Sequence, residues 1–263
     1  MSISTDKISY IAFVFLGLVC LLSWNVILAS LDFYEKYLGE YTPTFVFPMM
    51  NFVLNVFLQI YLVIFGNKFT YFKQMLAALL VCILTMTLLP IVVLNVESSK
   101  TAFIFCCLLI ALQGFANALF QSNVFGICGF LPFKFIIAVS YGTGLSGIVV
   151  NLLRYILIAS YGVENQGDDS VMIASIYIFY GITVLFLFVG VALLFLVFKN
   201  PWFIHNITKG GNLEEYSAIK VNNIRSFYVF CKKVFVLLLT LGLINPSRFC
   251  RVPLHEKAAM FTC

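Results

Sequence analysis

The sequence predicts an all-α integral membrane protein with a bundle of six transmembrane helices. Three observations lead to this fold class. Hydrophobic residues make up 62% of the chain and charged residues only 10%, which is too little polar material to cover the surface of a soluble domain. Six apolar segments are long enough to cross a bilayer, which takes roughly 20 helical residues. Lysine and arginine collect in alternate connections between these segments.

The six predicted spans follow one another with short connections. They cover residues 9–31, 42–65, 74–96, 101–125, 135–161 and 171–198. A polar segment at 1–8 precedes the first span. That span is longer than a usual signal-peptide core, its amino flank carries only Lys7, and no small-residue cleavage pattern follows it, so we expect it to be retained as a helix.

The chain changes character after the sixth span. Residues 199–226 form the longest polar connection, which we interpret as a cytosolic loop. Residues 227–245 resume an apolar run, but Lys232 and Lys233 interrupt it, and the rest is too short to cross a bilayer. We therefore predict a partial seventh span there, followed by an atypical polar tail at 246–263.

The positive charges predict the orientation. Seven Lys and Arg residues lie in the connections on the side of the amino terminus and two on the opposite side: Lys68, Lys73, Lys134, Lys199, Lys209, Lys220 and Arg225 against Lys36 and Lys100. Cytosolic connections carry this excess, so the amino terminus is predicted to be cytosolic. As a separate expectation, the protein lies in the plasma membrane rather than in an internal membrane. The same excess of Lys and Arg explains the net charge of +5, so the charge gives no reason to expect a nucleic-acid partner. The lipid bilayer is the expected partner of the apolar surface.

The cysteines do not predict a metal or cofactor site. Those in the spans have no metal-ligand spacing, and the chain contains only two histidines. We expect them to be small packed or lipid-facing side chains: Cys20, Cys82, Cys106, Cys107 and Cys128. No cofactor is predicted.

Polar residues form a stripe on each of three spans. The stripes have three- and four-residue spacing and comprise Asn51, Asn55 and Gln59; Gln113, Asn117 and Gln121; and Ser140, Gly144, Gly147, Asn151 and Arg154. Such residues hold membrane helices together through hydrogen bonds and close contacts. They also line aqueous cavities, where amides suit a neutral solute because they both donate and accept. Three coincident stripes favour the cavity, with helix packing as the alternative.

Arg154 is the only formal charge deep inside a predicted span. A buried guanidinium needs a partner, and no acidic residue lies within the six spans. The partner could be a carbonyl, an amide such as Asn151, water, or a carboxylate on a part of the protein not yet identified. The alternative is that its long side chain reaches the outer interface, about two turns away. Both possibilities stay open at this level.

Four segments match motifs of a known family. They are 21–25 (LLSWN), 121–132 (QSNVFGICGFLP), 141–147 (YGTGLSG) and 151–155 (NLLRY). In this order and in these spans, they resemble the equilibrative nucleoside transporters. The resemblance implies eleven spans, six plus five, in a fold related to the major facilitator superfamily, with alternating access to a central site. The six-helix bundle then resembles the amino-terminal half of such a carrier.

The resemblance also implies site residues and a function. Trp24 would flank the solute, Leu21 and Leu28 would lie one turn away on either side, and Gln121 would hydrogen-bond a nucleobase. Asn117 shares the face of Gln121 and joins this substrate-binding set. Structural or gating roles fall to Gly144, Gly147, Asn151 and Arg154. The implied function is facilitated transport of nucleosides or nucleobases.

The sequence departs from the family pattern in two ways. Ser23 replaces the usual proline, and Ser122-Asn123 stands where Gly-Ser is usual. The family's Asp and Arg of the eighth span, which hold the ribose, have no counterpart. We therefore expect a carrier half that does not transport alone. Two explanations remain: a truncated version of a longer carrier, or a half that associates with a second half or a second copy.

Other classes of membrane protein fit less well. A seven-helix-type receptor matches the helix count, but it needs its amino terminus outside, against the lysine distribution. A non-transporting membrane interaction protein is a further alternative. Catalysis is not expected, because no span carries a histidine, an acidic pair or a serine with a plausible base.

Overall fold

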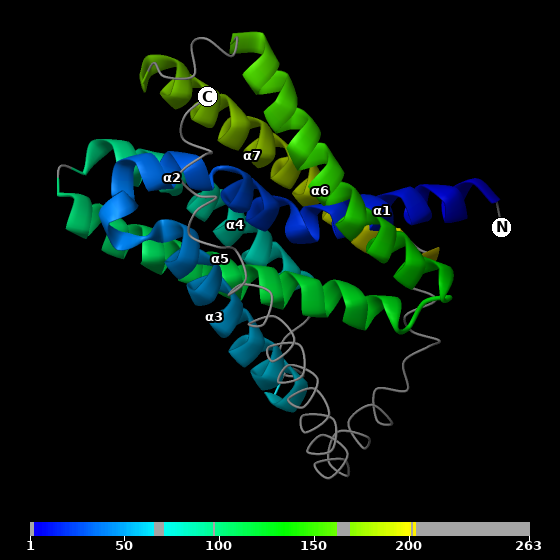
Figure 1. Ribbon diagram of the computed structural model, residues 1–263. Coiled ribbons are helices and arrows are strands. Elements are labelled where there is room, and N and C mark those ends of the chain that lie inside the picture. The colour runs from blue at the N-terminus through cyan, green and yellow to red at the C-terminus, as the bar shows by residue number, and fades with distance from the viewer. Residues whose placement is uncertain (1–2, 66–70, 97, 162–168, 201, 204–263) are drawn as a thin grey trace, which may run out of the picture. The chain divides into compact units, whose positions relative to one another are not determined.

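The computed structural model describes residues 3–65, 71–96, 98–161, 169–200 and 202–203. Within these residues all regular structure is helical (Figure 1). The helices are α1 (Ile3–Ala29), α2 (Leu31–Leu38), the 3-10 helix η1 (Gly39–Tyr41), α3 (Pro43–Phe65), α4 (Tyr71–Asn95), α5 (Ser99–Cys128), α6 (Lys134–Tyr161) and α7 (Asp169–Lys199). The predicted all-α class is confirmed.

Six of these helices, α1 and α3 to α7, are long and apolar enough to cross a membrane. Each coincides with one predicted span, within a few residues at either end. The protein is therefore an integral membrane protein with the expected helix order. The predicted partial seventh span at 227–245, the tail at 246–263 and nearly all of the loop at 199–226 lie outside the described residues.

The sequence analysis missed α2. The first span was predicted to run to residue 31, but α1 ends at Ala29, and α2 begins two residues later. This short helix buries Phe33, Tyr34 and Leu38 on one face and exposes Asp32 and Glu35 on the other. Its charged residues are typical of a polar loop between two spans. The helical spacing of its apolar residues becomes clear only once the buried face is known.

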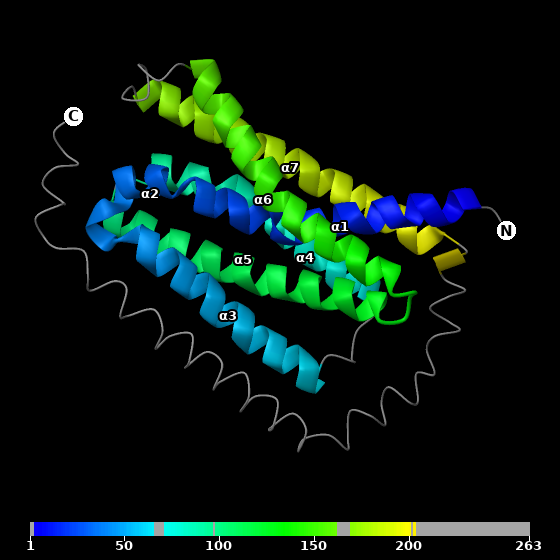
Figure 2. The ribbon, with the colours of Figure 1, turned by 45° about the vertical axis from the view of Figure 1, so that its right-hand side comes forward.

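The helix α1 lies at the centre of the bundle. Of the residues in its most apolar stretch, 61% are buried by the rest of the protein, compared with 17% for the corresponding stretch of α3. It contacts α6 and α7 on one side and α5 on the other, while α5 also packs against α3 and α4 (Figures 1 and 2). The exposed apolar side chains of α3, such as Phe52 and Phe57, suit a lipid environment.

Two glycines allow α1 and α6 to touch through their backbones. A Cβ atom on Gly142 would lie 1.9 Å from the Val14 carbonyl oxygen, and one on Gly17 would lie 2.2 Å from the Val139 carbonyl oxygen. Any larger residue would force the helices apart. Small residues at helix contacts are typical of membrane bundles, where close backbone packing drives association.

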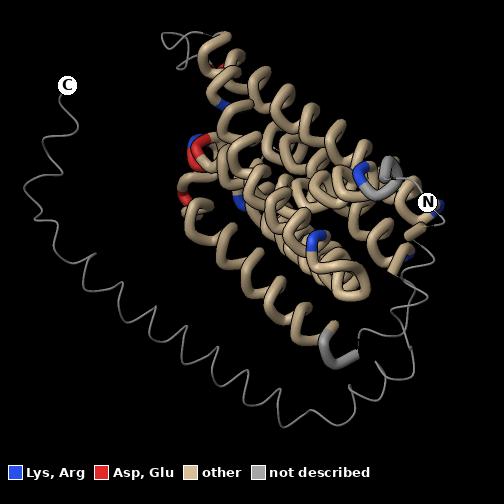
Figure 3. The backbone as a smooth tube through the Cα atoms, turned by 90° about the vertical axis from the view of Figure 1, so that its right-hand side faces the viewer, with Lys and Arg blue, Asp and Glu red and all other residues tan. Residues whose placement is uncertain are grey.

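Acidic residues gather toward one end of the described bundle, together with some basic residues, whereas the other end carries basic residues (Figure 3). The ion pairs Asp32–Arg154 and Lys36–Asp169 bring α2, the end of α6 and the start of α7 to the same end. Lys134 and Lys199 are at the other ends of α6 and α7. The helices thus sort these charges onto the two sides as expected, while the side that faces the cytosol stays a prediction.

Candidate functional site

Two amides of the α5 stripe lie inside the bundle. Gln113 is fully buried and Asn117 is 4% exposed. The Gln113 Nε2 atom donates to Asn117 Oδ1 at 3.2 Å and to the Cys82 sulfur of α4 at 3.4 Å. The Thr85 hydroxyl bonds to Gln113 Oε1. This cluster joins α4 to α5, and it uses the Asn117 side chain between the two helices.

The α3 stripe is also divided between two environments. Asn51 is 4% exposed and lies against α5, where a Cβ atom on Gly114 would come within 2.7 Å of the Asn51 carbonyl oxygen. One turn further, Gln59 Nε2 donates to Asn55 Oδ1 at 2.7 Å on a half-exposed surface. Residues of one stripe therefore meet different surroundings, since helical spacing defines a face but not the neighbour that covers it.

The remaining predicted solute contacts lie on accessible surfaces of α1 and α5. Leu21 and Trp24 are half-buried, Leu28 is exposed, and all three share one face of α1 at three- and four-residue spacing. Gln121 of α5 is half-buried, unlike Gln113 two turns earlier. Since α1 and α5 are in contact, these side chains come from neighbouring helices of one bundle.

A hydrogen bond beside Trp24 ties α1 to α6. The Asn25 Nδ2 atom donates to the Ser146 hydroxyl at 2.7 Å, across 121 residues of sequence. The predicted Gly147 lies here, because a Cβ atom on it would come within 4.0 Å of the same Nδ2 atom. The sequence analysis quoted Asn25 only as part of the LLSWN motif and missed this positioning role.

The outward side of α6 carries the other predicted stripe residues. A Cβ atom on Gly144 would meet nothing within 4 Å. Asn151 is exposed, and its Nδ2 atom donates to the Gly147 carbonyl oxygen at 2.9 Å. Neither residue is used to pack the described helices together. This side of α6 is therefore an open surface, and no described helix comes close enough to Gly144 to exclude a larger side chain there.

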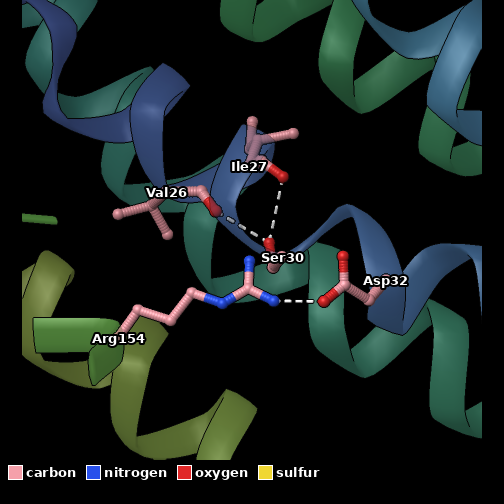
Figure 4. A network of polar contacts seen from close by, with 5 residues as sticks. All are labelled: Val26, Ile27, Ser30, Asp32 and Arg154. Carbon is pink, nitrogen blue, oxygen red and sulfur yellow. Dashed lines mark hydrogen bonds and ion pairs between the residues drawn. The ribbon is translucent and has the colours of Figure 1, made fainter. Parts of the chain in front are cut away.

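Arg154 pairs with a carboxylate outside the spans. Figure 4 shows its guanidinium extending from α6 to Asp32 of α2, where Nη2 bonds to Oδ2. The side chains are 32% and 70% exposed, respectively. Of the partners considered from the sequence, the structure selects a carboxylate on the neighbouring α2. A second ion pair, Lys36 with Asp169, connects α2 to α7.

Buried hydroxyl groups complete the attachment of α2. The Tyr34 and Tyr180 hydroxyl oxygens are 2.6 Å apart, and the Ser30 hydroxyl lies 2.9 Å from that of Tyr180. Burial, followed by the neighbouring Tyr180, raises the pKa of Tyr34 well above its ordinary value. Its hydroxyl therefore stays protonated and holds α2 against α7 by a neutral hydrogen bond.

The cysteines of the described helices are free thiols that pack in the bundle, with only Cys107 half-buried. In the part of the chain that the structure describes, no group of three or more His, Cys, Asp or Glu residues lies close enough to hold a metal ion.

Comparisons with known proteins agree with the motifs. A family model described as "Nucleoside transporter" matches residues 107–248. Similar Arabidopsis thaliana proteins include equilibrative nucleotide transporter 1, which is 25% identical over 182 residues (67% of this chain and 40% of the relative). Equilibrative nucleotide transporter 7 is 26% identical over 189 residues (70% and 44%), and equilibrative nucleotide transporter 8 is 22% identical over 164 residues (61% and 42%).

The chain spans less than half the length of these curated relatives. The family match nevertheless extends over more than half of the chain and includes α6 and most of α5, with Gln121 and Arg154. The matched range also includes α7, the last of the six apolar helices. The chain therefore belongs to the nucleoside transporter family, a family of membrane carriers rather than enzymes.

Proposed function

We propose that this chain forms one six-helix half of a carrier for nucleosides or nucleobases. The observation that carries the proposal is the family match over 107–248, which contains three of the four quoted motifs. Transport would be facilitated diffusion, in which two halves rock about a central site and expose it to each side in turn.

The proposed solute site is formed by Trp24, Leu21 and Leu28 of α1 with Gln121 of α5. An indole ring offers a flat apolar surface to a base, and a carboxamide can donate to and accept from its polar edge. The partial exposure of Trp24 and Gln121 leaves them available to a solute. Asn117 is left out of the proposed site because its side chain is used between α4 and α5.

The backbone contact between α1 and α6 supports a rocking mechanism. Gly17 and Gly142 bring the two helices together without intervening side chains, and the Asn25–Ser146 hydrogen bond connects the same helices next to Trp24. Close-packed elements transmit movement as units rather than deform continuously. The half would therefore carry Trp24 with it as it moves.

The proposed partner of this half covers the open side of α6. Gly144 would allow a second helix to approach closely, and the exposed Asn151 could hydrogen-bond to it. Gly147 and Arg154 keep their proposed structural roles, through Asn25 and Asp32 respectively. The partner would be a second half or a second copy of this chain.

Uptake into sealed vesicles tests the proposed function. We expect no saturable uridine or adenosine uptake with this chain alone, and saturable uptake when it is coexpressed with the carboxyl-terminal half of an Arabidopsis relative. Gln121→Leu should reduce the coexpressed activity about tenfold or more, because the nucleobase loses its amide partner.

Gln59→Leu serves as the matched control, since this amide lies on α3 and bonds to Asn55. It should leave uptake unchanged. Saturable uptake by the chain alone would contradict the half-carrier proposal, and equal losses in both variants would contradict the proposed role of Gln121.

A further inference from the structure

A cavity of about 150 Å³ lies where α2 meets α6 and α7. Its apolar wall comes from four helical segments and includes Ala29, Phe33, Leu157, Met172, Ile176 and Phe179. The hydroxyls of Ser30 and Ser175 also line it, as does the Asp32–Arg154 ion pair. The cavity thus combines a long apolar wall with one positive and one negative group.

The surroundings of the cavity indicate access from the bilayer. Tyr155 and Ile156 on α6, and Tyr177 and Ile178 on α7, are exposed apolar side chains beside the lining residues. Apolar surface of this kind on spanning helices faces lipid. The ion pair joins α6 to α2, the short helix that follows the end of α1 (Figure 4), and long basic side chains near the ends of spanning helices reach the level of the lipid headgroups.

We propose that this cavity binds a zwitterionic phospholipid from the bilayer. One acyl chain would lie against the apolar wall between α6 and α7. The lipid phosphate would accept hydrogen bonds from the Arg154 guanidinium, and the headgroup ammonium would pair with the Asp32 carboxylate. The inference is independent of the transported solute and of the proposed half-carrier.

Charge complementarity selects the headgroup class. Asp32 and Arg154 together carry no net charge. When a zwitterion binds, the pair between them is replaced by two pairs, phosphate with Arg154 and ammonium with Asp32, and no charge is left unpaired. The phosphate of an anionic headgroup would pair with Arg154 and leave the nearby Asp32 carboxylate without a cation. Phosphatidylethanolamine is the appropriate probe because its ammonium donates hydrogen bonds.

Native mass spectrometry of the full chain tests the proposal. The protein is extracted from vesicles of equal phosphatidylethanolamine and phosphatidylglycerol content, and the retained lipids are counted. The unaltered chain should retain phosphatidylethanolamine in preference. Arg154→Gln should lower this retention about tenfold, because the phosphate loses a charged donor. Asp32→Asn should shift the preference to phosphatidylglycerol, because the repulsion is removed and Arg154 is freed.

A second ion pair at the same end provides the matched control. Lys36→Gln breaks the contact with Asp169, but Lys36 does not itself line this cavity, so retention should not change. Ser175→Phe fills the cavity and keeps both charges, and it should abolish retention of the lipid.

The Asp32→Asn variant keeps the test decisive if Arg154→Gln aggregates, since Asp32 is 70% exposed and its replacement leaves the helix packing intact. Equal retention of the two lipids by the unaltered chain would overturn the proposal. So would an Asp32→Asn variant with the unaltered preference, or a Ser175→Phe variant that retains the lipid.

Discussion

At the scale of single residues, identical amino acids on one helix have opposite surroundings. Gly142 and Gly144 lie two residues apart on α6, yet a Cβ atom on Gly142 would clash with the α1 backbone, whereas one on Gly144 would meet open space. Gln113 and Gln121 of α5 differ in the same way, because the first is fully buried and the second only partly. The residue type therefore does not reveal whether a position serves packing or binding.

Alanine substitution should separate the two glycines. We expect Gly142→Ala to destabilise the folded chain by about 1–3 kcal/mol, because the added methyl group overlaps backbone atoms that cannot rotate away. Gly144→Ala, on the same helix, should leave stability unchanged. Thermal unfolding followed by size-exclusion chromatography in detergent measures both. Equal melting temperatures for the two variants would rule out the close α1–α6 contact.

At the scale of secondary structure, α2 connects helices that are distant in the sequence. Its buried face packs into the bundle, Asp32 pairs with Arg154 of α6, and Lys36 pairs with Asp169 of α7. Exposed ion pairs contribute little stability, typically up to about 1 kcal/mol each. The buried face and the Tyr34–Tyr180 hydrogen bond therefore carry most of its attachment.

Removal of one hydroxyl group should loosen α2. Tyr34→Phe leaves the ring contacts in place but removes the hydrogen bond to Tyr180, so the amide protons of residues 31–38 should exchange about five- to tenfold faster. Tyr37→Phe is the control, because among the described residues Tyr37 has a ring contact with Phe33 and no hydroxyl hydrogen bond. Hydrogen exchange measured by mass spectrometry reports both. Equal protection in the two variants would assign the attachment of α2 to its apolar face alone.

At the scale of the whole molecule, the described helices form a bundle with chemically different ends. The ion pairs of α2 with Arg154 and Asp169 lie at one end, and Lys134 and Lys199 are at the other ends of α6 and α7. This arrangement follows from consecutive spans that run in alternate directions. Together with the lysine bias of the connections, it predicts that the lysine end faces the cytosol.

Epitope accessibility tests this orientation. An amino-terminal tag should bind antibody only after the cells are permeabilised, whereas a tag inserted at 162–168 should be labelled on intact cells if the protein lies in the plasma membrane. The sequon at Asn206 provides an internal check, because a cytosolic loop is never N-glycosylated. Labelling of the amino-terminal tag on intact cells, or glycosylation of Asn206, would reverse the topology.

The sequence by itself determined the membrane class, the order of the six described spans and the family. Each follows from information that is local in the chain. The apolar runs need only be long enough for the bilayer, and motifs such as 121–132 are read directly. Among the described residues, the sequence analysis missed α2, which is too short and too charged for this criterion.

The tertiary structure decided which neighbour each polar residue meets. Asp32 and Arg154 are 122 residues apart in the chain, and helical spacing assigns Gln113, Asn117 and Gln121 to one face without telling which of them another helix covers. Gly142 was not among the stripe residues, although it lies against the backbone of α1, whereas Gly144 has no neighbour within 4 Å of its Cβ position. Periodicity defines a direction around one helix, whereas packing depends on how several helices cross, and only the assembled bundle contains that information.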